Sequence, residues 1–195
     1  MYRLPTQIVD KPWGCQGIDA RFNVQPDRKV GEVWFEAPEG DSLDVMVKYL
    51  FTSERLSIQV HPDDATAQAR GLGHGKDECW IVLDAQPGAE IAIGTREAMS
   101  VDALIDAARD GSIVDAVDWR PVSRGQFLYN PAGTVHALGA GLTVLEIQQA
   151  ISLTYRLFDY GRPRELHLEE SRDVIDPRLD PIGHAGLFRT AARNL

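Results

Sequence analysis

The chain has 195 residues, 44% of them hydrophobic and 25% charged, so it is long enough to bury a core as one large domain without disulfides. Lys and Arg number 20 against 29 Asp and Glu, and the resulting net charge of -9 disfavours binding to nucleic acid or to a membrane surface. The same balance still allows a few cations to gather in a pocket that binds a small anion.

The two cysteines, Cys15 and Cys79, make neither a disulfide framework nor a thiolate zinc motif, which favours a reducing compartment. The first residues, MYRLPTQIVDKPWG, carry prolines and charges where a secretory signal would be apolar. No stretch reaches the roughly 20 apolar residues needed to cross a bilayer. We therefore expect a cytoplasmic protein.

Most of the chain has the pattern of short β-strands separated by turn residues. The expected strands cover residues 31–37, 42–51, 56–61, 78–83, 89–93, 125–131, 134–138 and 142–149. The turn sequence DAQPG stands between the fourth and fifth of these and predicts a β-hairpin. Strands at this spacing, with Gly and Pro between them, predict a mainly β protein built as an antiparallel sandwich or barrel.

Two segments between the strands have a helical pattern. Asp63 and Asp64 can cap a short helix over 65–70, which Gly71 would end. A longer helix is predicted between Ser100 and Gly111, with a further turn through residue 117. Its apolar face carries Val101, Leu104, Ile105 and Ala108. We expect this face to pack over one end of the barrel, although such a stripe can also bind a partner.

Beyond Arg162 the sequence becomes charged and contains three prolines. We expect residues 1–168 to form a single domain. Residues 169–195 would then form a tail that packs on or near the barrel, with a short helix around 169–175.

Polar residues alternate with apolar ones in the sequence LSIQVH. In a strand, Ser57, Gln59 and His61 share one face, which indicates that this face lines a cavity. Lys76, Glu78 and Trp80 share a face by the same rule, and we expect Trp80 to be core rather than a platform for a sugar.

Two imidazoles, a carboxylate and an amide oxygen suit a divalent ion such as zinc with coordination positions left open. The residues are Gln59, His61, Glu78 and His136, the last of which follows a Pro-Ala-Gly turn. A single histidine is more often structural than a metal ligand. Spacing alone therefore leaves both a metal site and ordinary core histidines open.

Three stretches resemble the type I phosphomannose isomerase family: LSIQVHPDD at 56–64, GKDECWIVLDAQPGA at 75–89 and PAGTVHALGAGLTVLEIQQ at 131–149. TYRLFDYGR at 154–162 is also similar, and KPWG at 11–14 and GEVW at 31–34 more weakly so. The resemblance runs over most of residues 11–168. It implies a cupin jelly-roll barrel with a few short helices and one zinc or other divalent ion. It also implies interconversion of mannose 6-phosphate and fructose 6-phosphate through an enediol.

The resemblance also implies roles for single residues. Gln59, His61, Glu78 and His136 fall on the family's metal ligands. Lys76 and Arg156 match residues that face the substrate or take part in catalysis, and Ser57 matches a serine beside the substrate phosphate. Lys76 could act as the general base if burial and the ion lowered its pKa. Each of these residues also has a purely structural alternative. Lys76 could lie in solvent, Arg156 could pair with Asp159, and Ser57 could form a hydrogen bond with nearby backbone.

The sequence departs from the family in two places. Ser152 stands where related bacterial enzymes usually carry an aspartate, shortly before the TYR triplet, and no second β-rich module follows the core. A cupin that binds metal and a sugar phosphate with little or no turnover therefore stays open as an alternative. A metal-dependent oxygenase is less favoured. The apolar faces could also support a homodimer.

Overall fold

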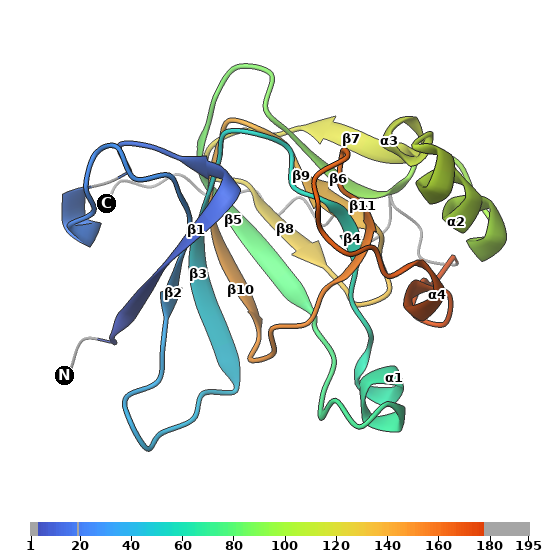
Figure 1. Ribbon diagram of the computed structural model, residues 1–195, viewed down its shortest axis with the longest axis horizontal. Helices are drawn as coiled ribbons and strands as arrows, with labels where there is room; N and C mark the ends of the chain where they lie inside the picture. Colours follow the sequence, from blue (N-terminus) through green and yellow to red (C-terminus); the bar gives the residue numbers. More distant parts are fainter. Residues whose placement is uncertain (1–3, 19, 178–195) are drawn as a thin grey trace.

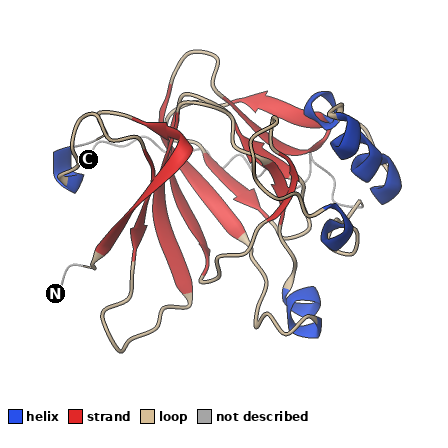
Figure 2. Cartoon of the chain, viewed as in Figure 1, coloured by secondary structure: helices blue, strands red, loops and turns tan. Residues whose placement is uncertain are grey.

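The structure, a computed structural model, describes residues 4–18 and 20–177, which form two facing antiparallel β-sheets. In sheet A the neighbouring strands are β1 (Thr6–Cys15), β2 (Val30–Phe35), β3 (Val45–Thr52), β10 (Leu142–Gln149), β5 (Glu78–Ala85) and β8 (Phe127–Asn130). In sheet B they are β11 (Tyr155–Phe158), β4 (Ile58–Val60), β9 (His136–Leu138), β6 (Glu90–Thr95) and β7 (Val117–Pro121). Figures 1 and 2 show the two sheets opposite each other, which confirms the predicted mainly β class.

The hairpin predicted at DAQPG is wrong. β5 pairs with β10 and β8 in sheet A, whereas β6 pairs with β9 and β7 in sheet B. The turn is bonded to other segments on both sides, because Gln86 N donates to Gly141 O and Glu90 O accepts from Gly139 N. The connection therefore carries the chain from one sheet to the other, a route that local turn chemistry does not distinguish from a hairpin.

Both predicted helices are confirmed at their caps. α1 (Asp64–Ala69) begins where the Asp63 side chain accepts a hydrogen bond from Thr66 N. α2 (Val101–Asp110) begins at the Ser100 side chain and ends at Gly111, whose φ of 87° suits a residue without a Cβ. The remaining helical segments are η1 (Ala20–Phe22), α3 (Ile113–Ala116) and α4 (Leu168–Ser171).

Helices α2, α3 and α4 lie on the outer side of sheet B (Figure 1). The apolar residues of β4, Ile58 and Val60, belong to one buried cluster with Leu104 and Ile105 of α2. Both faces of β4 are therefore covered, the apolar one by helices and the polar one by sheet A. Val174 and Ile175 are buried in the same cluster, and residues 178–195 of the expected tail lie outside the described residues.

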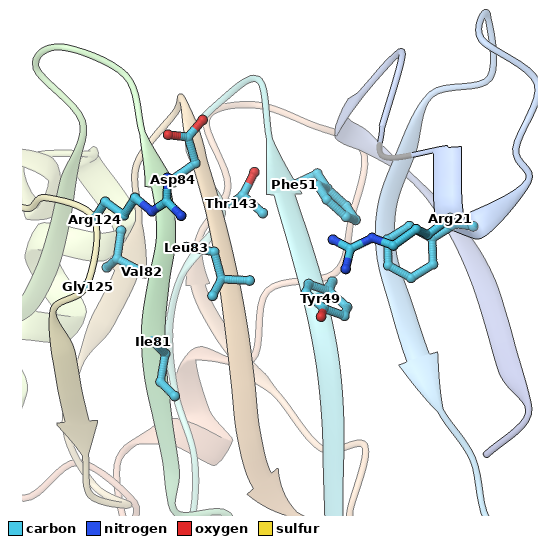
Figure 3. A pocket seen from close by; sticks show the side chains of 11 residues that line it. Arg21, Tyr49, Phe51, Ile81, Val82, Leu83, Asp84, Arg124, Gly125 and Thr143 are labelled. Carbon is cyan, nitrogen blue, oxygen red and sulfur yellow. The ribbon is translucent and has the colours of Figure 1, made fainter. Parts of the chain in front are cut away.

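The outer face of sheet A carries a shallow hollow of about 620 Å³. Figure 3 shows side chains from β3, β10 and β5 along it, with Arg21 and Arg124 at opposite sides. Tyr49 and Phe51 stack there with ring centroids 6.2 Å apart. This hollow is separated from the space between the sheets by sheet A itself.

Candidate metal centre

Three buried side chains from the facing sheets converge on one point. His61 follows β4, His136 begins β9, and Glu78 begins β5 in the opposite sheet. Their ligand atoms all lie within 4.8 Å of one another. Glu78 Oε1 is 2.9 Å from His136 Nε2 and 3.5 Å from His61 Nε2. The structure thus brings together the two imidazoles and the carboxylate that the sequence analysis proposed as metal ligands.

The hydrogen bonds of His136 show which of its ring nitrogens faces Glu78. His136 Nδ1 lies 2.9 Å from the carbonyl oxygen of Thr134, which can only accept, so Nδ1 carries a proton. In the neutral ring Nε2 then presents a lone pair to Glu78 Oε1 at 2.9 Å. Two acceptors at that distance need a proton or a metal ion between them. The donor set of two imidazole nitrogens and a carboxylate oxygen fits a divalent ion such as zinc.

Gln59 lies beside this cluster, because it pairs with His136 across β4 and β9. Its amide nitrogen faces the ring, with Nε2 at 3.2 Å from His136 Nε2. Its oxygen accepts a hydrogen bond from Ser57 Oγ at 3.2 Å. For Gln59 to bind a metal ion through oxygen, the side-chain amide must therefore turn over.

Charges next to the cluster set the protonation of its members. Lys76 Nζ lies 3.0 Å from Glu78 Oε2 and 3.2 Å from His61 Nε2. Burial, with Lys76 adding to it, lowers the pKa of His61 to about 4, so this ring is neutral near pH 7. Burial alone would raise the pKa of Glu78, but Lys76, His61 and His136 hold that pKa well below its usual value. The centre therefore holds a carboxylate and a neutral imidazole, the forms that bind metal.

Lys76 stays charged in this environment. Burial alone would lower its pKa, but Glu78 and Glu146 outweigh burial and raise it. Lys76 therefore lacks the lowered pKa that a general base would need.

A pocket between the sheets lies next to the centre. Four residues predicted from the sequence line it: Ser57, Gln59, Lys76 and Arg156. Its other charged residues, which the sequence analysis missed, are Lys11, Glu32, Lys48, Glu146 and Arg164. Cations outnumber carboxylates in the lining, although the whole chain has a net charge of -9. The pocket can therefore attract a small anion.

Lys48 and Glu146 are the most deeply buried of these missed residues. Their strands β3 and β10 place them directly opposite each other, and Lys48 Nζ lies 3.1 Å from Glu146 Oε1. Trp80 Nε1 donates to the other carboxylate oxygen at 2.9 Å, and the Trp80 ring is fully buried as predicted. The sequence did contain a signal for this pair, because a Lys and a Glu occupy inward positions of the otherwise apolar strands β3 and β10.

Arg156 lies on β11 at the pocket wall and is not the partner of Asp159. Its guanidinium donates to Glu165 O at 2.8 Å, and its Nε has no hydrogen-bond partner among the described residues. Asp159 instead receives two hydrogen bonds from Arg164, at 2.5 and 2.7 Å, and pairs with Arg162. Burial, followed by the nearby charge of Arg164, lowers the pKa of Arg156.

The other residues singled out in the sequence lie away from the centre. Ser152 is exposed and does not line the pocket. His74 contacts Gly75 O, and His167 Nδ1 accepts a hydrogen bond from Arg156 N. His184 lies outside the described residues.

Curated relatives match almost the whole chain, although no family model matches it. It is 38% identical over 205 residues to mannose-6-phosphate isomerase ManA of Bacillus subtilis, covering 94% of this chain and 64% of that protein. It is 42% identical over 191 residues to mannose-6-phosphate isomerase of Streptococcus mutans, covering 89% and 60%. For the putative mannose-6-phosphate isomerase YvyI of Bacillus subtilis the identity is 39%, covering 88% and 67%. The chain thus spans less than two thirds of the first two relatives.

Solved structures share the fold. The mannose 6-phosphate isomerase of Bacillus subtilis superposes with a TM-score of 0.80 at 31% identity, covering 89% of this chain and 68% of that one. A zinc-bound mannose 6-phosphate isomerase superposes with a TM-score of 0.64 at 13% identity, covering 94% and 76%, and shows the fold alone. The two antiparallel sheets with few helices match these structures, which confirms the predicted fold class.

Proposed function

The chain belongs to the mannose-6-phosphate isomerase family, and we propose on that basis that it interconverts mannose 6-phosphate and fructose 6-phosphate through an enediol. The observation that carries the proposal is the buried His61–Glu78–His136 cluster, which lies beside a pocket lined by several cations, one of which, Lys76, contacts Glu78. A metal centre beside a cationic pocket can supply what this isomerisation needs, namely stabilisation of the enediol oxygens and binding of the phosphate.

We propose that zinc is held by His61, Glu78 and His136, with Gln59 joining after its amide turns over. A bound divalent ion would polarise the sugar carbonyl and stabilise the negative charge that builds on the enediol oxygens. Glu78 is then occupied as a ligand, which argues against its service as a general base.

Lys76 and Arg156 supply positive charge on the substrate side of the centre. The raised pKa of Lys76 supports a role as a donor to a substrate oxygen, because a charged ammonium has no lone pair with which to take a proton. The buried Nε of Arg156 has no hydrogen-bond partner in the described part of the chain, which leaves donor capacity for a substrate oxygen. Both are proposed as catalytic residues that stabilise charge rather than move the proton.

We propose that the phosphate group binds between Ser57, Arg156 and Arg164. All three line the same pocket, and arginine binds phosphate oxygens by paired hydrogen bonds. Asp159 would hold Arg164 in place for this task.

A sugar-phosphate-binding protein with a metal but little turnover is the second candidate. One observation favours it: Ser152 stands where related enzymes usually carry an aspartate, although this position is exposed and does not line the pocket. If proton transfer in relatives depends on that carboxylate, this chain lacks the group.

The test is isomerisation of mannose 6-phosphate by the purified protein, with zinc and after chelation. Zinc-dependent formation of fructose 6-phosphate supports the isomerase. Bound zinc and bound mannose 6-phosphate with no turnover would contradict it and establish the binding protein. The matched control is His74→Ala, which removes a histidine that does not line the pocket.

Further proposals concern the setting of the protein. We propose a cytoplasmic location, supported by two free cysteines in the described part of the chain. None of the helices described has the length and apolar character that a membrane crossing requires. We also propose one domain over residues 1–168 with a tail over 169–195, and pairing of two copies as a homodimer, which sedimentation would test.

A further inference from the structure

Asn130 is a buried amide in contact with two of the three members of the metal centre. It ends β8 and lies directly opposite Glu78 in the strand register. Its Nδ2 donates to Glu78 Oε1 at 3.1 Å and lies 3.1 Å from His136 Nδ1. The residue is 0% exposed, so its hydrogen-bonding groups can be paired only by the centre and the residues around it.

From these contacts we infer that Asn130 is a positioning residue that orients Glu78 for metal binding. The two oxygens of Glu78 have different donors, Lys76 at Oε2 and Asn130 at Oε1. Together these donors fix the plane of the carboxylate and keep Oε1 directed at the two imidazoles. Without Asn130, the charged ammonium of Lys76 is the strongest remaining attraction, and the carboxylate is free to turn toward it.

Asn130 also lies against the His136 ring. His136 Nδ1 gives its proton to Thr134 O at 2.9 Å, and this bond holds the ring with Nε2 toward the centre. Asn130 Nδ2, 3.1 Å from Nδ1, makes a packing contact with the ring edge and no hydrogen bond, since both nitrogens are then donors. Partners of this kind around metal ligands typically change metal affinity by about 10- to 100-fold when they are mutated.

A purely structural role explains Asn130 less well. Its Oδ1 is buried and has no hydrogen-bond partner among the described residues. A buried amide with half of its capacity unmet is costly, and an apolar residue of similar volume would avoid that cost. Asn130 therefore benefits metal binding at the centre rather than the stability of the fold.

The inference rests on the metal centre of the proposed function, and its test does not use turnover. Zinc affinity is measured by competition with a chromophoric chelator for the wild type and Asn130→Leu. The urea stability of the metal-free proteins is measured alongside. We expect zinc affinity to fall about 10- to 100-fold, while the metal-free variant stays at least as stable as the wild type.

Tyr129→Phe is the matched control, because it removes one hydrogen bond, to Asp77, from the neighbouring residue of the same strand. Its zinc affinity should equal that of the wild type. Asn130→Val, which is smaller, takes the place of Asn130→Leu if the latter does not fold. Unchanged zinc affinity in the folded variant overturns the inference. Failure of the wild type to bind zinc overturns the metal centre as well, whereas zinc binding without isomerisation contradicts only the proposed activity.

Discussion

Lys48 on β3 and Glu146 on β10 form an ion pair inside the barrel, with Nζ and Oε1 3.1 Å apart and both side chains less than a tenth exposed. Burial alone would raise the pKa of Glu146, but Lys48, Lys76 and the hydrogen bond from Trp80 together outweigh burial and lower that pKa. The pair lines the pocket next to the metal centre, so it holds a charged pair at a place where water is largely excluded.

Removing one member of this pair should be costly. Lys48→Met leaves the Glu146 carboxylate buried without its partner, which we expect to lower the free energy of unfolding by about 3–5 kcal/mol. Lys48→Met/Glu146→Gln should lose less, since the Gln oxygen can still accept from Trp80. Urea denaturation of the two single variants and the double variant gives the coupling. The exposed pair Lys29–Glu54 is the control, with an expected loss of about 1 kcal/mol at most. A coupling near zero would contradict the prediction.

His136→Ala should abolish zinc binding and activity together, because the variant removes a ligand and leaves Glu78 with one imidazole. Metal content after dialysis is the measurement. Zinc retained at one ion per chain would show that His136 is not a ligand. His74→Ala should keep both zinc and activity.

Lys76→Ala should spare the metal and remove turnover, because its ammonium lies beside Glu78 without being a metal ligand. We expect bound zinc to stay unchanged while kcat falls about 100-fold or more, the size seen when an electrostatic donor is removed. Lys29→Ala, on the surface, should have full activity. Unchanged turnover in Lys76→Ala would exclude an essential role for Lys76.

Strands whose residues alternate strongly are predicted from the sequence almost to the residue. β10 spans 142–149 in both the prediction and the structure, because its inward and outward residues alternate without a break. The three missed strands, β1, β7 and β11, all lie at the edges of sheets. β1 contains Pro12 and Gly14 and has an irregular register, which an edge tolerates because it forms fewer ladder bonds and buries less apolar surface.

The residues of the candidate site also divide into those that local sequence patterns predict and those that they do not. His61 and Glu78 could be assigned a side of their strands from period-2 alternation alone. Lys48 and Asn130 could not be linked to them, since their partners come from distant parts of the chain through strand pairing. The wrong hairpin at DAQPG has the same cause, because strand order depends on long-range contacts that a local pattern does not contain.

The metal-free protein should lose stability as pH falls below about 6.5. The unfolded chain protonates His61 near pH 6.5, whereas the folded chain does so only near a pKa of about 4. Between these values the unfolded state binds more protons, so the free energy of unfolding decreases as pH decreases. At about 1.4 kcal/mol per unit, His61 contributes about 3 kcal/mol above pH 6.5 that is lost by pH 4.

Urea denaturation at pH 7 and pH 4.5 checks this contribution in chelated protein. His61→Asn removes the titrating ring, and the difference in stability between the two pH values should shrink by about 2–3 kcal/mol relative to the wild type. Equal pH dependence in both proteins would show that the pKa of His61 is the same in the folded and the unfolded chain.

Arg164 should contribute to binding the phosphate group of the substrate. Asp159 is only 2% exposed and accepts from Arg164 at two atoms, Nε and one terminal nitrogen, which holds the guanidinium at the pocket wall. A charge-assisted hydrogen bond contributes about 1.5–3 kcal/mol, so Arg164→Ala should lower kcat/KM for mannose 6-phosphate about 10- to 100-fold. Most of this loss should appear in KM, because the phosphate is remote from the reacting carbons.

The matched control for Arg164 is Arg124→Ala, which removes an exposed arginine beside the hollow on the outer face of sheet A. Its kcat/KM should equal that of the wild type. Asp159→Asn keeps the side-chain shape but removes the charge that holds Arg164, so it should raise KM in the same direction by a smaller factor. If Arg164→Ala leaves KM unchanged while Arg156→Ala raises it, the phosphate is bound by Arg156 alone, and the Asp159–Arg164 pair only stabilises the fold.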